Sequence, residues 1–377
     1  MAEAFKNLIN TDLVQQAAKC LQQVAPDFDA PGFVRLACHD LESLEMKARA
    51  LHICAALQAT MPTDFVQAAA QLEAALAPPE AGEAMAQLHG LTEGLRGWIL
   101  WPVGEYIARC GLAHPARALQ TLHALTQRFT AEFAIRPFIE HQPELCFTTF
   151  ARWVSDDSAH VRRLVSEGSR PRLPWGQQLK ALIRDPGPSL PLLEALQDDA
   201  SPYVRRSVAN HLNDIAKDHP KLIAQWLKLH LPQAPAERRA LLKHASRTLI
   251  KAGDPAVLKA WGLGGRFVGQ ATLKLRPTRV QLGEQLQLSL HLQSGSNRAQ
   301  SLAIDYAVHH VKADGSTSAK VFKGWVLQLP AQGTIQLEKN HSMRLITTRR
   351  YYSGRHMVTV HINGQVLAEG SFLLVMP

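Results

Sequence analysis

One internal repeat constrains the fold of this chain more than any other feature. Residues 156–165 (DDSAHVRRLV) have a counterpart in residues 198–208 (DDASPYVRRSV), and Arg206 follows Arg163 by 43 positions. That spacing lies within the roughly 40–47-residue period of HEAT and armadillo helical repeats. Each copy begins with paired aspartates, which suit helix N-termini because their carboxylates meet unpaired N–H groups there. The repeat therefore predicts an α-solenoid.

Polar side chains recur at helical spacing in both copies of the repeat. Arg163 and Glu167 are four residues apart, and Arg206, Asn210 and Asp214 continue the same spacing. Residues four apart share one face of a helix. One interpretation is an intrahelical ion pair on a solvated face. The other is a polar wall facing a charged ligand, because solenoids often bind along one concave surface.

Several classes of protein are disfavoured by what the sequence lacks. The five cysteines are widely spaced and form no CxxC pair, which argues against a disulfide framework and a zinc or iron–sulfur site. No HExxH motif, Walker loop or dinucleotide fingerprint occurs, so we expect no metal and no cofactor. No leader-like segment opens the sequence, and no apolar stretch approaches the about 20 residues of a membrane span. We therefore expect a cytoplasmic protein that does not bind membranes.

The spacing of apolar residues changes near residue 264. Residues 1 to about 260 have apolar groups at helical spacing, and the predicted helices include 33–57, 132–139 and 145–154. Beyond this point residues 271–276, 285–292 and 357–362 alternate with period two, and Asp-Gly, Ser-Gly and Asn-Gly pairs mark turns. About seven short strands predict an immunoglobulin-like β-sandwich. We expect a helical-repeat domain over residues 1–264 and the sandwich over 265–377.

Positive charge is concentrated in the predicted sandwich. The chain has a formal net charge of +9, and residues 265–377 contain 13 Lys plus Arg against 5 Asp plus Glu. Such asymmetry indicates a polyanionic partner, with nucleic acid first and an anionic membrane surface second.

Four motifs in the helical part resemble one known family. They are AEFAIRPFI at residues 131–139, RWVSDD at 152–157, VRRLVSEGSRPRLPW at 161–175 and VRRSVANHLNDIAK at 204–217. These segments resemble the AlkC branch of the HEAT-like DNA alkylation repair glycosylases, which is related more distantly to the AlkD branch. The match is specific over about residues 120–255. AlkC proteins often add an immunoglobulin-like domain, so we expect the resemblance to extend to the remainder.

The resemblance implies a monofunctional DNA glycosylase that removes bases such as 3-methyladenine and 3-methylcytosine from double-stranded DNA. Position by position, Glu132 and Asp214 would form the acidic centre and Trp175 an aromatic wall. The neighbouring site residues would be Arg163, Glu167 and Arg170. The sequence has Asn210 where the AlkD branch carries a tryptophan, and it lacks that branch's Trp-Trp-Asp run. The carboxylates must therefore carry more of the chemistry.

Carboxylates suit this reaction for a physical reason. A base alkylated at N3 is often cationic and is already a good leaving group, so positive charge develops on the deoxyribose as the bond breaks. Carboxylates fixed beside the sugar stabilise that charge, and one of them can orient the attacking water. The structural alternatives are an ordinary Glu132–Arg136 pair, an Asp214 that caps or pairs with Lys217 or Arg206, and a Trp175 that plugs the core.

DNA contacts are expected from two groups of side chains. In the helical part they are Arg170, Arg172 and Arg206, of which Arg170 and Arg172 lie in a Pro-broken loop. In the predicted sandwich, basic and aromatic groups surround a Ser353-Gly354 turn and suit a DNA groove or phosphates; they are Arg349, Arg350, Tyr351 and Arg355. Tyr351 is open to a second interpretation, as a buried sandwich residue.

A non-catalytic helical-repeat scaffold that binds DNA or protein is the competing hypothesis. A glycosylase that also cleaves the DNA strand requires an amine nucleophile, and no lysine stands out among the residues matched to the family, so we expect no lyase activity. We expect a monomer. The hypothesis depends on Glu132 and Asp214 meeting in a basic cradle beside the sugar.

Overall fold

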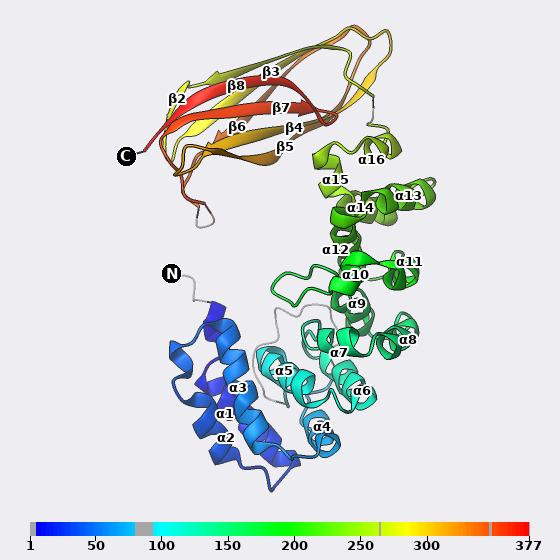
Figure 1. The fold of residues 1–377 in the computed structure, drawn as a ribbon, viewed down its shortest axis with the longest axis vertical. Helices are drawn as coiled ribbons and strands as arrows, with labels where there is room; N and C mark the ends of the chain where they lie inside the picture. The colour runs from blue at the N-terminus through cyan, green and yellow to red at the C-terminus, as the bar shows by residue number, and fades with distance from the viewer. Residues whose placement is uncertain (1–4, 80–92, 264, 347–348, 377) are drawn as a thin grey trace. The chain divides into compact units, whose positions relative to one another are not determined.

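The computed structural model describes residues 5–79, 93–263, 265–346 and 349–376. The chain divides into two compact units (Figure 1). Unit 1 comprises Met1–Asp218 and Ala236–Ala245, and unit 2 comprises His219–Pro235 and Ser246–Pro377. Among the described residues, no helix combines the length and apolarity needed to cross a bilayer.

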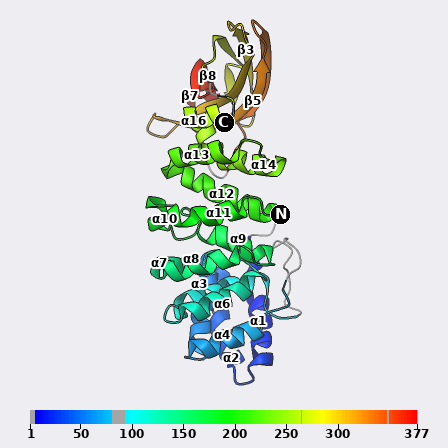
Figure 2. The same cartoon turned by 90° about the vertical axis from the view of Figure 1, so that its right-hand side faces the viewer.

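Unit 1 is built from helices that follow one another in layers (Figure 2). Helix α9 packs against α6, α8, α11 and α12, and α12 packs against α14. The predicted helical repeat is confirmed, because Arg163 and Arg206 lie on the neighbouring helices α9 and α12. The helices are α1 Thr11–Val24, α2 Ala30–Cys38, α3 Met46–Thr60, α4 Phe65–Ala74, α5 Leu100–Cys110, α6 Pro115–Thr126, α7 Arg136–His141, α8 Pro143–Trp153, α9 Ala159–Gly168, α10 Lys180–Arg184, α11 Leu190–Leu196, α12 Pro202–Asp218 and α14 Ala236–Ala245, with 3-10 turns η1 Phe5–Leu8, η2 Leu41–Ser43, η4 Gly97–Ile99 and η5 Gly187–Ser189.

Two predicted helices in unit 1 have different bounds in the structure. The helix expected over 33–57 is interrupted between Cys38 and Met46, where Asp40 takes a left-handed backbone conformation with φ +51°. The helix expected over 132–139 begins only at Arg136, with Pro137 in its first turn, where a residue without an N–H is tolerated. Glu132 therefore lies in the turn that precedes α7 rather than on a helix.

In the described part of unit 2 there are three helices and an immunoglobulin-like β-sandwich. Its helices are α13 Pro220–His230, α15 Arg247–Ala252 and α16 Pro255–Ala260. Its strands are β1 Gly269–Arg276, β2 Arg279–Gln281, β3 Gln285–Ser294, β4 Gln300–Val311, β5 Thr317–Leu329, β6 Thr334–Ser342, β7 Gly354–Ile362 and β8 Gln365–Val375. The order is β1-β3-β6 in one sheet and β2-β8-β7-β4-β5 in the other. The last helix ends and the first strand begins close to residue 264, where the sequence predicts the change. The boundary between domains 1–264 and 265–377 stays a prediction.

The turn signals of the sandwich have different outcomes. Asn363 and Gly364 form the two-residue turn of the β7–β8 hairpin, and both have positive φ, at 48° and 81°. This is the geometry that an Asn-Gly pair favours. Ser353-Gly354 is not a hairpin turn, because β6 and β7 belong to different sheets. The basic and aromatic segment around it is instead part of a connection from one sheet to the other.

The sandwich core follows the period-two pattern of its strands. In β3, Leu286, Leu288, Leu290 and Leu292 are all buried, while the residues between them are exposed or half-buried. Three histidines are also buried in the sandwich, and we call them the sandwich histidines; they are His310, His341 and His356.

Candidate functional site: a buried chain of ion pairs

Two equivalent helices and two flanking segments assemble the predicted site residues of unit 1. Arg163 and Glu167 lie on α9, and Asp214 lies on α12, which packs beside it. Glu132 precedes α7, and Arg170 directly follows α9. The repeat explains this convergence, because the same face of successive repeats points to the same side of a solenoid.

Arg163 connects Glu132 to Glu167. Its Nη1 donates to Glu132 Oε2 at 3.0 Å and to the Thr130 hydroxyl at 2.6 Å. Its Nη2 lies 3.6 Å from Glu167 Oε1. The guanidinium carbon is also 5.3 Å from the centre of the Tyr203 ring, which is within cation–π range. The i,i+4 pair expected from the sequence is present, but it is one contact within a larger network.

Arg170 continues the network from Glu167 to Asp214. Its Nη1 donates to Glu167 Oε1 at 2.7 Å, and its Nε donates to Asp214 Oδ2 at 2.9 Å. The other carboxylate oxygen of Asp214 accepts from Lys217 Nζ at 2.8 Å. Asp214 is 2% exposed and Arg170 is 7% exposed, so both partners of this contact are buried.

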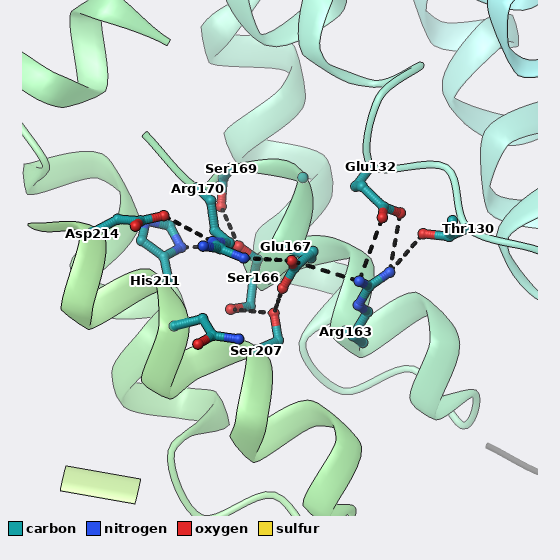
Figure 3. Close-up of polar contacts among 12 residues, drawn as sticks. Thr130, Glu132, Arg163, Ser166, Glu167, Ser169, Arg170, Ser207, His211 and Asp214 are labelled. Atoms are coloured by element: carbon teal, nitrogen blue, oxygen red, sulfur yellow. Dashed lines mark hydrogen bonds and ion pairs between the residues drawn. The ribbon is translucent and has the colours of Figure 1, made fainter. Parts of the chain in front are cut away.

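These contacts form one continuous line of alternating charge, which we call the ion-pair chain (Figure 3). Its members, in order, are Glu132, Arg163, Glu167, Arg170, Asp214 and Lys217. Glu132 and Asp214 do not touch each other in it. They stand on either side of Glu167, and each is held by an arginine.

Glu167 is the central carboxylate of the ion-pair chain and is 7% exposed. Burial alone would raise its pKa, but the guanidinium groups of Arg163 and Arg170 and the hydroxyl of Ser207 outweigh burial and hold the pKa below its ordinary value. Burial would lower the pKa of Arg170, but the carboxylates of Glu167 and Asp214 raise it above its ordinary value. The chain is therefore ionised throughout its centre at neutral pH.

A second layer of hydrogen bonds joins α9 to α12 beneath Glu167, and we call it the serine seam. Ser207 Oγ lies 2.6 Å from Glu167 Oε2 and 3.1 Å from Ser166 Oγ. Because a carboxylate only accepts, the Ser207 proton points to Glu167, and the Ser166 hydroxyl donates to Ser207. His211 Nδ1 donates to the Ser166 carbonyl at 2.9 Å, and burial lowers the pKa of His211 to about 4. The imidazole is therefore neutral.

Trp175 is presented to solvent rather than packed in the core. Its side chain is 79% exposed, and its backbone has φ +63°. It lies in the segment between α9 and α10, residues 169–179, which we call the Trp175 loop. Arg172 of this loop is bound by Asp218, with both hydrogen bonds at 2.8 Å.

The other predicted residues of the helical part lie outside the ion-pair chain. Arg206 is exposed on α12. Asn210 is half-buried, and its Oδ1 accepts from His244 Nε2 of α14 at 2.9 Å. Arg136 does not pair with Glu132, because two nitrogens of its guanidinium donate to backbone carbonyls instead. No group of three or more His, Cys, Asp or Glu side chains in the described part of the chain is placed to hold a metal ion.

The predicted DNA-contacting residues of unit 2 are not equally available. Arg349 and Arg350 line an open depression, and Arg350 lies over the Tyr352 ring at 5.6 Å. Arg355 is exposed on β7. Tyr351 is only 8% exposed, and its ring packs against His310 at 5.6 Å. The second interpretation of Tyr351, as a sandwich residue, therefore describes its place in the fold.

Sequence reasoning missed Thr130 and the serine seam. Serines and a histidine on a helix of mixed polarity carry no spacing signal that separates them from ordinary core residues. Only the packing of α9 against α12 brings them to Glu167.

This architecture is that of a helical-repeat protein with an immunoglobulin-like domain and a charged site on the repeats. A family described as "Uncharacterised protein YhaZ, C-terminal Ig-like domain" matches residues 270–376. The uncharacterized protein YhaZ of Bacillus subtilis (strain 168) is 37% identical over 368 residues, which cover 96% of this chain and 97% of YhaZ.

A solved structure covers the same length. It is the Pseudomonas fluorescens alkylpurine DNA glycosylase AlkC bound to DNA containing an abasic site analog, which is 34% identical with a TM-score of 0.87. The similarity covers 99% of this chain and 100% of that protein. The chain therefore belongs to the AlkC-type family of HEAT-like DNA glycosylases and has the alkylpurine DNA glycosylase fold, and it is homologous to YhaZ.

Proposed function

We propose that this protein is a monofunctional DNA glycosylase. It hydrolyses the N-glycosidic bond of alkylated bases such as 3-methyladenine and 3-methylcytosine in double-stranded DNA, and it acts as a monomer. The proposal is supported by similarity along the whole chain to an alkylpurine DNA glycosylase. The observation that carries it is the ion-pair chain, in which Glu132 is linked to Glu167 through the half-buried Arg163 and Asp214 is linked to Glu167 through the buried Arg170.

In the proposed mechanism, the carboxylates stabilise the charge that develops on the sugar. Arg163 and Arg170 hold Glu132 and Asp214 in fixed orientations, so little reorganisation is needed when the glycosidic bond breaks. One of the two carboxylates orients the water that attacks the sugar. Trp175 adds an exposed aromatic face for a cationic base, an attraction of about 0.5–2 kcal/mol.

Basic side chains would supply the contacts to the DNA backbone. The exposed candidates are Arg206 on α12 and Arg355 on β7, with Arg349 and Arg350 in the depression of unit 2. Arg172 reaches a phosphate only by exchanging its contact with Asp218, and Arg170 is engaged inside the ion-pair chain. Phosphate contacts give affinity without sequence preference.

The test is single-turnover release of 3-methyladenine from methylated duplex DNA by Glu132→Gln and Asp214→Asn. We expect each variant to lose about 100- to 1,000-fold in rate, because one well-placed electrostatic group contributes about 3–4 kcal/mol to such a barrier. Affinity for the DNA and the melting temperature report whether the fold is kept. If both variants release the base normally, the assignment is wrong.

A matched control is available on the same solenoid. Asp199 is also ion-paired, with Arg162 Nε 2.7 Å from its Oδ2 and its side chain 5% exposed, but it lies outside the ion-pair chain. Asp199→Asn should lower stability and leave the rate of base release near that of the wild type.

The same DNA distinguishes the competing functions. A scaffold that only binds DNA would produce no abasic sites at any enzyme concentration. A glycosylase with lyase activity would be trapped covalently on the DNA by borohydride, and we expect no trapped species.

A further inference from the structure

The Trp175 loop holds its tryptophan in an unfavourable conformation. A non-glycine residue with φ near +60° costs about 1–3 kcal/mol unless its surroundings enforce it, and the exposed indole has few contacts to do so. Within the loop, Leu179 N donates to Pro171 O at 3.1 Å, and Gly176 N donates to Leu173 O at 3.2 Å. These two bonds shape the loop but do not fix it to the rest of unit 1.

Arg170 and Arg172 bind the first half of the loop to Asp214 and Asp218 of α12, and Gln177 binds Glu140 of α7. Arg136 adds contacts to backbone carbonyls on both sides of Trp175. Its Nη1 donates to Gly168 O at 2.8 Å, where α9 ends. Its Nε donates to Gln177 O at 2.5 Å, two residues after Trp175. Gly168 packs so closely that a Cβ there would lie 2.7 Å from a methyl group of Ile135. One rigid guanidinium therefore ties the start and the end of the loop to the first turn of α7.

Arg136 places a buried positive charge at this contact, although the charge is not paired with a carboxylate in the described part of the chain. Arg136 is 0% exposed, and its Nη2 has no hydrogen-bond partner among the residues that the structure describes. Burial lowers its pKa to about 10, so the group stays charged at neutral pH. A buried cation without a directly bound carboxylate is costly, and an apolar side chain of similar volume often stabilises such a position better. What only arginine offers is a planar fork that reaches two carbonyls at once.

We infer that Arg136 is a positioning residue, which holds Trp175 in place by fixing both ends of its loop. The inference rests on the proposed function, because it takes the indole as the wall against which the damaged nucleotide is placed. Arg136 itself is buried behind the loop and does not touch DNA. The charge of Arg136 also acts on Glu132, Glu167 and Asp214, and a lysine at this position keeps that charge. The effect of Arg136→Lys on base release is therefore expected to pass through Trp175.

The first experiment observes the loop without DNA. Arg136→Lys keeps the charge but cannot reach both carbonyls. Arg49→Lys is the matched control, because Arg49 is 1% exposed, donates to the carbonyls of Ile9, Leu44 and Glu42, and lies away from the loop. In protein labelled with 5-fluorotryptophan, the 19F resonance of Trp175, assigned with Trp175→Phe, should move toward the position of the free amino acid in Arg136→Lys only. An unchanged resonance overturns the inference.

The second experiment is a double-mutant cycle on the single-turnover rate. Arg136→Lys should slow base release about 10- to 100-fold, as expected for a misplaced contact group, while Arg49→Lys should stay within about twofold of the wild type. In a Trp175→Ala background, Arg136→Lys should have no further effect, because the two residues act as one unit. An equal slowing in both backgrounds overturns the inference.

Two further outcomes are covered by the same design. If Arg136→Lys does not fold, Gly168→Ala tests the loop from the other side, because it displaces one acceptor and keeps the buried charge. It should move the Trp175 resonance in the same direction, and an unmoved resonance counts against the inference. If the wild type releases no base, the proposed function fails, but the 19F experiment still decides whether Arg136 holds the loop.

Discussion

Removing the Ser207 hydroxyl should change the ionisation of Glu167. Ser207 Oγ lies 2.6 Å from Glu167 Oε2, whereas Arg163 and Arg170 both approach Oε1. Ser207→Ala therefore leaves Oε2 without a donor among the described residues. The substitution deletes one oxygen and does not alter any charge, so its effect on Glu167 is interpretable.

The magnitude follows from the strength of this hydrogen bond. A hydrogen bond to a charged group contributes about 1.5–3 kcal/mol, and one pKa unit corresponds to about 1.4 kcal/mol. The pKa of Glu167 should therefore rise in Ser207→Ala, because the charged form loses a hydrogen bond of about that strength. The charged or titratable groups around Glu167 are Arg163 on α9 and Arg170 after it, Tyr203, His211 and Asp214 on α12, and Glu132 and Arg136 near α7. All of them remain in the variant.

The sign of the linked stability change is fixed by the direction of the shift. Because the pKa of Glu167 is lowered in the folded protein, its contribution is present above the unfolded pKa and is lost as pH falls through the folded pKa. In Ser207→Ala the folded pKa lies closer to the unfolded value. The variant should be less stable near neutral pH, and its difference from the wild type should shrink as the solution is acidified.

The assay is a carboxyl-carbon NMR titration of protein labelled with 13C glutamate, in which Glu167 is assigned by Glu167→Gln. The acidic limb of the pH–rate profile for base release should move upward with the Glu167 pKa. Ser166→Ala is the control, since it removes a buried hydroxyl from the same seam but keeps the donor to Glu167. The reasoning is refuted if Glu167 titrates alike in wild type and Ser207→Ala, or if Ser166→Ala shifts it as much.

Three further predictions concern unit 2. Burial lowers the pKa of His310 to about 3 and that of His341 to about 4. The free energy of unfolding should therefore fall as pH decreases from about 6.5 toward 4, by about 3 kcal/mol for His341 alone. Urea denaturation from pH 7.5 to 4.5 measures this loss. Gly364→Ala should lower the melting temperature, because Gly364 has φ +81° and a Cβ there would lie 2.4 Å from the Cα of Gly253; an unchanged melting temperature would contradict this close approach. Arg350→Gln should flatten the plot of log DNA affinity against log salt by about 0.9 if the side chain contacts one phosphate; an equal slope would remove it from the interface.

The architecture could be predicted from the sequence because its signals are local and repeated. The 43-residue spacing of Arg163 and Arg206 depends on one repeat packing on the next, and the structure places them on adjacent helices. The Asn363-Gly364 turn was predictable because few other residue pairs accept two positive φ values. The Ser353-Gly354 prediction was wrong, because a turn-forming pair does not reveal whether the chain returns to the same sheet.

The candidate site was predictable only in part. The resemblance to a family selected Glu132, Glu167 and Asp214, but not the order in which arginines connect them. That order depends on the distance between α9 and α12 and on the turn before α7. Arg136 illustrates the limit, since its spacing from Glu132 indicates an ion pair and its side chain is instead bound to two carbonyls.

The ion-pair chain also determines which substitutions this lineage can accept one at a time. An inner member such as Glu167 is shared by two neighbours, so its neutralisation leaves two guanidinium groups facing each other without their common counterion. A terminal member such as Lys217 has one partner in the chain, Asp214. If Lys217 is lost, Arg170 still binds the Asp214 carboxylate. Sequence drift should therefore begin at Lys217, the end of the line without a proposed catalytic role, and inner positions should change only in compensating pairs.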